Sequence, residues 1–357
     1  MREKALKIIQ KIEENKYEAY FVGGFVRDHL LGRLSKDIDI TTSATPEEIM
    51  RIFPKNIPTG LKHGTVTVEM DGELFEITTF RTDGKYLDSR RPEEVIFVSD
   101  LEEDLKRRDF TINAMAINQF GDLIDPFNGY NDLVSGIIKC VGNPDKRFEE
   151  DALRMLRAIR FSFRYNFSIE EETLKSIYRN RKLISNISAE RIHMELQEIL
   201  SYSNRDLSIL EPLLKEIFSF EINIPKKTKN NYLLNYALLS NEPLKLAQRL
   251  KVSHLEKIQI QQIHKYINQP IGTRHLLKEA GYEIAKIIIS ETKQCSFEDL
   301  EKLNSLPNTL KDLPVNGTDL IELGYTGKEI GLKLEELLEK QLNCENILTK
   351  EELLKNI

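Results

Sequence analysis

The spacing of apolar residues divides the chain into a mixed N-terminal part and a helical remainder. In residues 1–14, apolar side chains recur three and four positions apart among charged ones, which predicts an amphipathic helix. The apolar run from Tyr20 to Val22 predicts a strand, and a second helix is expected to begin near Val26. From Arg147 onward the helical spacing continues almost to the end of the chain. The pattern therefore predicts an α+β part followed by helices.

Alternation with a period of two marks the strands of the first part. The stretch "DIDIT" beginning at Asp37 alternates in this way, and Thr65–Met70 and Leu74–Phe80 flank the turn pair Asp71-Gly72, which predicts a β-hairpin. Residues 81–101 carry charges with little periodicity and are expected to form a long loop, a feature that is usually functional or mobile.

The composition is that of a globular protein, and the length of 357 residues predicts more than one folding unit. Three cysteines without a CxxC pair argue against a disulfide framework and a zinc site and favour a reducing cytoplasm. No apolar run approaches the roughly 20 residues of a membrane span. The net charge is −6, yet residues 225–278 hold ten Lys or Arg against Glu242 and Glu256. This basic segment is either a surface for phosphates or an ordinary lysine-rich surface.

Two aspartates and a preceding glycine pair suggest metal and phosphate chemistry. Asp37 and Asp39 would project from the same face of a strand, where a cation relieves their repulsion, and Mg²⁺ prefers such carboxylates together with phosphates and water. Gly23-Gly24 would let backbone amides approach phosphate oxygens at a helix N-terminus, with Arg27 as a fixed cation. The alternative for an isolated Asp-x-Asp is a solvated strand edge.

Glu76 is a third acidic candidate on the returning strand of the predicted hairpin. If the strands pair in one sheet, its carboxylate would lie beside the two aspartates and assist them in catalysis. Its alternative is an exposed strand residue.

Five sequence blocks together resemble the bacterial (class II) tRNA nucleotidyltransferases, or CCA-adding enzymes, and the related poly(A) polymerases of the polymerase β-like superfamily. The blocks, which occur in the order and at the spacing of that family over about the first 200 residues, are "GGFVRDHLLGRLSKDIDITT", "RRDFTINAMA", "DPFNGYNDL", "EEDALRMLRAIRF" and "SAERIHMEL".

The resemblance implies a fold and a domain order. We expect a polymerase β-like nucleotidyltransferase head with a mixed sheet and helices, then an all-helical neck, body and tail. The expected boundaries are 1–138 for the head, 139–205 for the nucleotide-selecting neck, 206–300 for the tRNA-binding body and 301–357 for the tail.

The resemblance also implies roles for individual residues. Asp37 and Asp39 match the pair that binds two Mg²⁺ ions, and the residues that match nucleotide contacts are Gly24, Arg27, Arg108, Asp151, Arg154, Arg157 and Arg160. Asp151 and Arg154 match the base-reading pair. Three positions apart on one predicted helix, they would otherwise be taken for a routine salt bridge.

An aspartate and an arginine together have the right chemistry to select C and A. Cytosine and adenine each present an amine donor beside a ring-nitrogen acceptor, whereas a carboxylate only accepts and a guanidinium only donates. Guanine and uracil present the reverse pattern and would leave buried groups unpaired, at a cost of roughly 1 to 3 kcal/mol each.

The function implied by the resemblance is template-independent addition of CCA to the 3′ acceptor end of tRNA from CTP and ATP, with release of pyrophosphate. Alternatives are an A-adding or CC-adding enzyme of a split pair, a poly(A) polymerase, or an RNA-binding protein with an idle fold. The loop with Tyr86, Asp88, Arg90 and Arg91 has full length, which counts against a CC-only enzyme. No membrane partner is expected, and a monomer or a homodimer both fit.

The remaining blocks have structural interpretations. In "RRDFTINAMA" the apolar residues are expected in the core, Thr111 and Asn113 are expected to satisfy backbone groups, and Asp109 is expected to hold Arg27 or a neighbouring arginine. "DPFNGYNDL" predicts a turn.

Overall fold

A mixed seven-stranded sheet organises the N-terminal part of the chain. The computed structural model describes residues 1–35, 37–83, 95–218, 222, 224–344 and 346–355. The strand order is β3-β4-β5-β2-β1-β8-β9, and β2 and β5 are parallel while the other neighbours are antiparallel. The strands are β1 Ala19–Val22, β2 Asp39–Thr42, β3 Asn56–Gly60, β4 Thr65–Met70, β5 Glu73–Thr79, β8 Ala116–Ile117 and β9 Leu123–Ile124. The predicted mixed-sheet head is confirmed.

The predicted hairpin is formed by β4 and β5. Asp71 and Gly72 connect them with φ of 51° and 81°, the positive values that a two-residue hairpin turn requires. The expected loop over residues 81–101 is wrong at its start and towards its end, because β6 (Arg81–Asp83) and β7 (Val95–Phe97) pair with each other. Tyr86, Asp88, Arg90 and Arg91 lie outside the described residues.

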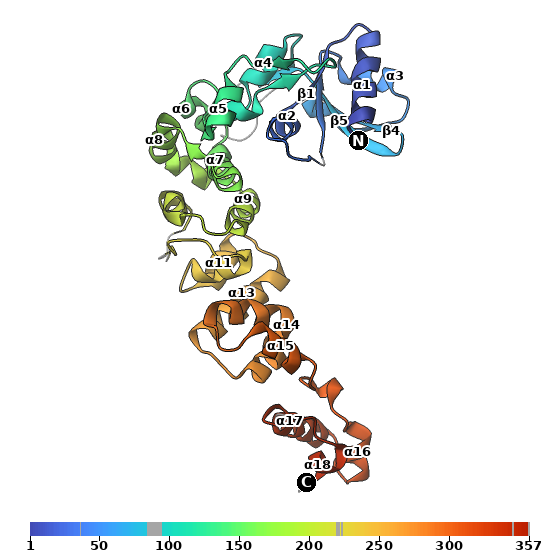
Figure 1. Ribbon diagram of the computed structural model, residues 1–357, viewed down its shortest axis with the longest axis vertical. Coiled ribbons are helices and arrows are strands. Elements are labelled where there is room, and N and C mark those ends of the chain that lie inside the picture. Colours follow the sequence, from blue (N-terminus) through green and yellow to red (C-terminus); the bar gives the residue numbers. More distant parts are fainter. Residues whose placement is uncertain (36, 84–94, 219–221, 223, 345, 356–357) are drawn as a thin grey trace. The chain divides into compact units, whose positions relative to one another are not determined.

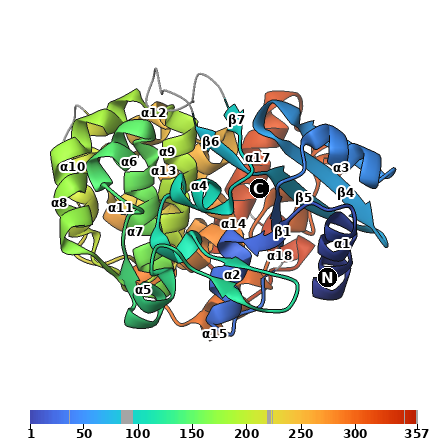
Figure 2. The same ribbon diagram turned by 90° about the horizontal axis from the view of Figure 1, so that it is seen from above.

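The described residues of the first of two compact units, Met1–Glu221, form ten α-helices. They are α1 Arg2–Glu14, α2 Gly23–Leu30, α3 Pro46–Ile52, α4 Leu101–Lys106, α5 Gly129–Ser135, α6 Pro144–Glu150, α7 Leu153–Tyr165, α8 Glu171–Asn180, α9 Ala189–Ser201 and α10 Glu211–Ile217. The amphipathic helix α1 buries Ala5, Ile8, Ile9 and Ile12 as predicted. In both views α1 and α2 lie on either side of β1 (Figures 1 and 2).

Helix α2 and the break between α6 and α7 differ from the sequence-based expectation. Helix α2 begins at Gly23, three residues before the predicted start, directly at the end of β1. The predicted continuous helix through Asp151 is wrong, since Asp151 has extended backbone angles, φ −146° and ψ 103°. Its carboxylate accepts a hydrogen bond from the Leu153 amide at 3.1 Å, a local bond that competes with helical pairing.

The second unit, Ile222–Ile357, is helical in its described residues. Its helices are α11 Tyr232–Leu238, α12 Pro243–Arg249, α13 His254–Asn268, α14 Thr273–Thr292, α15 Phe297–Asn304, α16 Gly317–Glu322, α17 Lys328–Leu342 and α18 Lys350–Leu354. Helix α14 is interrupted at Gly281, where φ is 74°. None of the helices in the described ranges combines the length and apolarity of a membrane span. The predicted boundaries at residues 138, 205 and 300 stay predictions.

Candidate functional site

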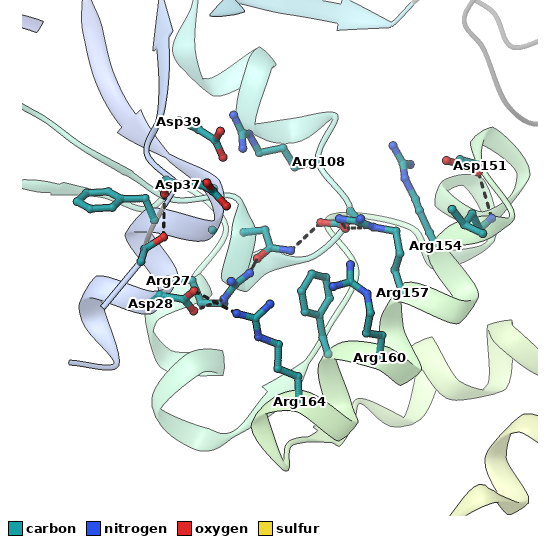
Figure 3. Close-up of a pocket in the computed structure, with 18 of the residues that line it drawn as sticks. Arg27, Asp28, Asp37, Asp39, Arg108, Asp151, Arg154, Arg157, Arg160 and Arg164 are labelled. Carbon is teal, nitrogen blue, oxygen red and sulfur yellow. Dashed lines mark hydrogen bonds and ion pairs between the residues drawn. The ribbon is translucent and has the colours of Figure 1, made fainter. Parts of the chain in front are cut away.

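A pocket in the first unit brings together the residues around β1, β2, α4 and α7. Its volume is about 980 Å³. The described residues that line it include eight arginines and five aspartates, namely Arg27, Arg107, Arg108, Arg154, Arg157, Arg160, Arg164 and Arg191 with Asp28, Asp37, Asp39, Asp109 and Asp151 (Figure 3). The surplus of arginine suits a polyanionic ligand.

The two glycines at the end of β1 form the turn that begins α2. Gly23 has φ +66°, and a Cβ there would lie 3.1 Å from Arg108 Nη1 and 3.4 Å from Asp39 Oδ2. Only glycine fits this position without strain. A Cβ on Gly24 would lie at an ordinary 3.5 Å from Arg27 Nη2, so the tighter constraint falls on the first glycine, which the sequence analysis did not single out from the pair.

Asp37 and Asp39 both line the pocket, although only Asp39 belongs to β2. Neither carboxylate makes a hydrogen bond or an ion pair with another described residue, and both are solvent-accessible. Desolvation by the surrounding protein atoms raises the pKa of Asp39. The charge of Arg108 lowers this pKa, and the charges of Glu76 and Asp37 raise it further. Two uncommitted carboxylates that face a pocket are suitable oxygen ligands for a hard divalent cation.

Glu76 lies beside Asp39 but outside the pocket lining. The two residues are partners in the parallel pairing of β2 and β5, as the sequence analysis expected, and the Glu76 side chain is exposed. In the described part of the chain, no group of three or more acidic, His or Cys side chains is arranged to hold a metal. Glu76 therefore acts on Asp39 through its charge in this conformation.

Arg27 is a buried cation with two of its nitrogens already bonded. Its side chain is about 5% exposed. Nε donates to Asp28 Oδ1 at 3.0 Å, and Nη1 donates to Asn113 Oδ1 at 2.5 Å. Nη2 makes no hydrogen bond to another described residue and would lie 3.5 Å from a Cβ placed on Gly24. Arg27 is thus fixed with one donor group near the glycine turn.

Asp109 connects this arginine to helix α7. Its Oδ1 accepts from the Asn113 amide at 2.9 Å, and its Oδ2 accepts from Arg157 Nε and Nη2 at 2.8 and 2.6 Å. Burial alone would raise the pKa of Asp109, but Arg157 and the Asn113 amide lower it to about 2. The expectation that Asn113 satisfies backbone groups is wrong, because its side chain joins two charged residues.

Arg108 lies across from Asp39 with unused hydrogen-bonding capacity. Its Nη2 is 3.2 Å from Asp104 Oδ2, a carboxylate that is fully buried. Its Nε is buried and has no partner among the described residues. Figure 3 shows the guanidinium beside Asp39. Asp104 also accepts from Arg107 at 2.8 Å, so this buried carboxylate, which the sequence analysis missed, fixes two neighbouring arginines.

Asp151 and Arg154 lie at the same end of the pocket (Figure 3). The Arg154 amide donates to the Asp151 carbonyl at 3.0 Å, but their side chains do not pair with each other. Asp151 pairs with Arg191 of α9 at 2.7 Å, and Arg154 pairs with Glu150 at 2.5 Å. Arg154 also donates to the carbonyl of Arg107 at 3.0 Å. The routine salt bridge between the two is therefore excluded for this conformation, because the break before α7 directs Asp151 towards α9.

Arg157, Arg160 and Arg164 follow one another along α7 towards Asp28 (Figure 3). Arg160 pairs with Glu195 of α9 at 2.6 Å, and Arg164 lies 3.7 Å from Asp28. Each of these arginines therefore has an acidic neighbour outside α7.

Part of the basic segment over residues 225–278 is neutralised or buried in the second unit. Lys229 pairs with Glu291 at 2.9 Å, and Lys278 pairs with Glu339 at 2.8 Å. Arg274 is buried and donates to backbone carbonyl groups. Among its other cations, Lys226, Lys227, Arg249 and Lys257 make no ion pair with a described residue and reach solvent.

Family models match two stretches of the first unit. The model of the poly A polymerase head domain matches residues 19–139, and that of the probable RNA and SrmB-binding site of polymerase A matches residues 166–219. The structure also resembles the crystal structure of the Bacillus stearothermophilus CCA-adding enzyme in complex with CTP. The TM-score is 0.76 and the sequences are 34% identical, over 96% of this chain and 92% of that one. The chain belongs to the family of bacterial CCA-adding enzymes.

Other members of the CCA-adding enzyme family agree with this assignment. The CCA-adding enzyme of Geobacillus kaustophilus is 54% identical over 199 residues, which are 56% of this chain and 49% of that protein. The chain therefore matches about half the length of such curated relatives. The Thermotoga maritima CCA-adding enzyme complexed with tRNA_CCA has a TM-score of 0.66 and 25% identity, over 98% of this chain and 92% of that one.

The candidate residues divide unevenly between the two family models. Those of the head, from Gly24 to Arg108, lie within the first matched stretch. Those of the neck, from Asp151 to Arg160, fall between the two stretches. Their assignment therefore depends on the "EEDALRMLRAIRF" block and on their position in the pocket.

Proposed function

We propose that the chain adds C, C and A to the 3′ end of tRNA, using CTP and ATP and releasing pyrophosphate, in the cytoplasm. The observation that carries the proposal is the pocket that places two uncommitted aspartates opposite a row of arginines, in a member of this family. Relatives were solved with CTP, with ATP and with tRNA_CCA.

Asp37 and Asp39 are the proposed ligands of Mg²⁺. The bound ions would activate the tRNA 3′ hydroxyl and neutralise charge on the leaving pyrophosphate. Glu76 is proposed to assist metal binding because its negative charge makes the potential at Asp39 more negative. Arg27 Nη2 and Arg108 Nη1, which both lie at the glycine turn, would donate to phosphate oxygens, and the backbone at Gly24 allows the triphosphate to approach.

Asp151 and Arg154 are the proposed base readers, by the donor and acceptor pattern that cytosine and adenine share. Both have other partners in the present conformation, Arg191 and Glu150. Reading a base therefore requires that each side chain exchange a protein partner for the ligand or share its polar atoms between the two. Arg157 and Arg160, held by Asp109 and Glu195, are proposed to line the nucleotide between base and phosphates.

The second unit is proposed to bind the acceptor region of tRNA. Lys226, Lys227, Arg249 and Lys257 are cations without a described acidic partner, and they would contact phosphates without reading sequence. The boundaries proposed for the functional regions remain 1–138, 139–205, 206–300 and 301–357.

One experiment separates this proposal from its alternatives. Purified protein is incubated with Mg²⁺, each labelled nucleoside triphosphate and tRNA that ends before CCA, after C, or after CC. Incorporation of two C residues followed by one A supports CCA addition. A alone on tRNA ending in CC indicates an A-adding enzyme, C alone a CC-adding enzyme, and long A tails a poly(A) polymerase. Absence of incorporation with retained tRNA binding indicates an idle RNA-binding protein.

A further inference from the structure

Tyr165, the last residue of α7, contacts the acidic partner of Arg27. The residue is buried, about 5% exposed, and its hydroxyl donates to Asp28 Oδ1 at 2.8 Å. The same oxygen accepts from Arg27 Nε at 3.0 Å. Arg164, the preceding residue on α7, lies 3.7 Å from the other carboxylate oxygen. One carboxylate of α2 thus gathers donors from the end of α7.

The Tyr165 ring also packs against the guanidinium groups around it. The central carbon of Arg27 lies 4.8 Å from the ring centroid, and those of Arg33 and Arg164 lie at 5.0 and 5.3 Å. The ring stacks on Phe161, one turn earlier on α7, with centroids 6.2 Å apart. Arg27 is therefore held by an aromatic face as well as by a carboxylate.

At neutral pH both groups keep the protonation state that the hydrogen bond between Tyr165 and Asp28 requires. Burial, with a contribution from the Asp28 carboxylate, raises the pKa of Tyr165 to about 12, so the hydroxyl remains a donor. Burial alone would raise the pKa of Asp28, but Arg27, Tyr165 and Arg164 lower it, so the carboxylate remains an acceptor.

Helix α7 reaches Arg27 by two routes. At one end Tyr165 bonds Asp28, which holds Nε. Two turns earlier Arg157 bonds Asp109, which orients Asn113, and Asn113 holds Nη1. Since both routes begin on one helix, the direction of the remaining nitrogen, Nη2, depends on how α7 is seated against α2.

We propose that Tyr165 is a positioning residue that orients Arg27 through Asp28 for binding nucleotide phosphates. The inference rests on the proposed function, in which Arg27 contacts the triphosphate. Because phosphates are common to both nucleotides, Tyr165 affects binding of CTP and ATP equally and leaves the choice between them unchanged.

The test uses Tyr165→Phe in the 357-residue chain, which removes the hydroxyl and keeps the ring. The matched control is Tyr20→Phe, because the Tyr20 hydroxyl also donates to a carboxylate, that of Glu18, at 3.3 Å, and Tyr20 does not line the pocket. We expect the KM for CTP and for ATP to rise about three- to tenfold in Tyr165→Phe, as for weakening a bond to a charged group. The KM for tRNA, kcat and the order of C and A addition should match the control.

Inorganic tripolyphosphate supplies a second measurement that excludes base and ribose. Its inhibition constant should rise by the same factor as the nucleotide KM values. A Tyr165→Phe protein with parental constants for CTP, ATP and tripolyphosphate would overturn the inference. So would a lower kcat with unchanged KM values, which is what a merely structural role or a smaller folded fraction produces.

A double-mutant cycle tests whether the effect passes through Asp28. In an Asp28→Asn background, Tyr165→Phe should change tripolyphosphate binding much less than in the parent. Fully additive effects would overturn the route through Asp28. If the parent adds no nucleotide to tRNA, the proposed function fails; calorimetric titration of the same proteins with tripolyphosphate then still decides the positioning role.

Discussion

Replacement of Gly23 by alanine tests whether the glycine turn shapes the phosphate end of the pocket. Gly23 has φ +66°, and its new Cβ would lie 3.1 Å from Arg108 Nη1. Gly32 provides the matched control, because it has φ +67° and a Cβ there would have no neighbour within 4 Å. Gly23→Ala and Gly32→Ala therefore share the same backbone strain, and only the first disturbs Arg108.

Backbone strain and displacement of Arg108 are expected to affect different measured quantities. A left-handed backbone costs an alanine about 1 to 2 kcal/mol, so both variants should lose that much stability. In Gly23→Ala the Arg108 guanidinium must also shift by a few tenths of an ångström, and its ion pair with Asp104 limits where it can go. If the shift weakens one phosphate contact by about 1 kcal/mol, nucleotide KM rises about fivefold.

The assay is the KM for CTP and ATP of both variants, measured well below their unfolding temperatures, with hydrogen exchange of the α2 region as the measure of stability. We expect equal protection losses and a KM increase confined to Gly23→Ala. Equal KM values in Gly23→Ala and Gly32→Ala would refute the claim that the first glycine keeps space for Arg108.

Three further predictions follow from the same pocket. Asp37→Ala should abolish nucleotide transfer and leave tRNA binding, measured by gel shift, nearly unchanged; retained transfer would contradict the metal assignment. Arg154→Ala should admit UTP, whereas Arg179→Ala, which changes an arginine outside the pocket lining, should not; a variant that rejects UTP as strictly as the parent would place base selection elsewhere. Asp109 has a pKa of about 2 in the fold against an ordinary 3.8, so its ionised form stabilises the fold by about 2 kcal/mol above pH 4, and this contribution is lost as the pH falls towards 2. Denaturation measured across this range should show a steeper acid loss for the parent than for Asp109→Asn, and equal slopes would contradict the assignment.

Local sequence signals predicted the elements whose partners are near in the chain. The hairpin around Asp71-Gly72 and the helix that buries Ile8 and Ile12 follow from turn chemistry and periodicity. The core positions of Phe110, Ile112 and Met115 follow from periodicity as well. Such features depend on backbone preferences and burial, which neighbouring residues largely determine.

Features that depend on distant partners were missed. The break at Asp151 accompanies a salt bridge to Arg191, forty residues later, and β6 pairs with a strand beyond the intervening segment. Asn113 resembles a backbone-capping residue in sequence, yet its partner Arg27 lies on another helix. No local pattern reports such contacts, although the spacing of Asp109 and Asn113 in "RRDFTIN" places both on one turn.

The partners of the arginines indicate which of their donor groups are available to a ligand. Arg157 and Arg160 are paired with Asp109 and Glu195, so a ligand gains from them only the charge that these carboxylates leave uncompensated. Arg108 retains Nη1 and Arg27 retains Nη2 near the glycine turn, and neither atom has a hydrogen-bond partner among the described residues. A phosphate oxygen would therefore find the most available donors at the end of the pocket nearest Asp37 and Asp39. In the proposed function the base then occupies the end where Asp151 and Arg154 lie, so the groups that hold the triphosphate would also orient the nucleotide.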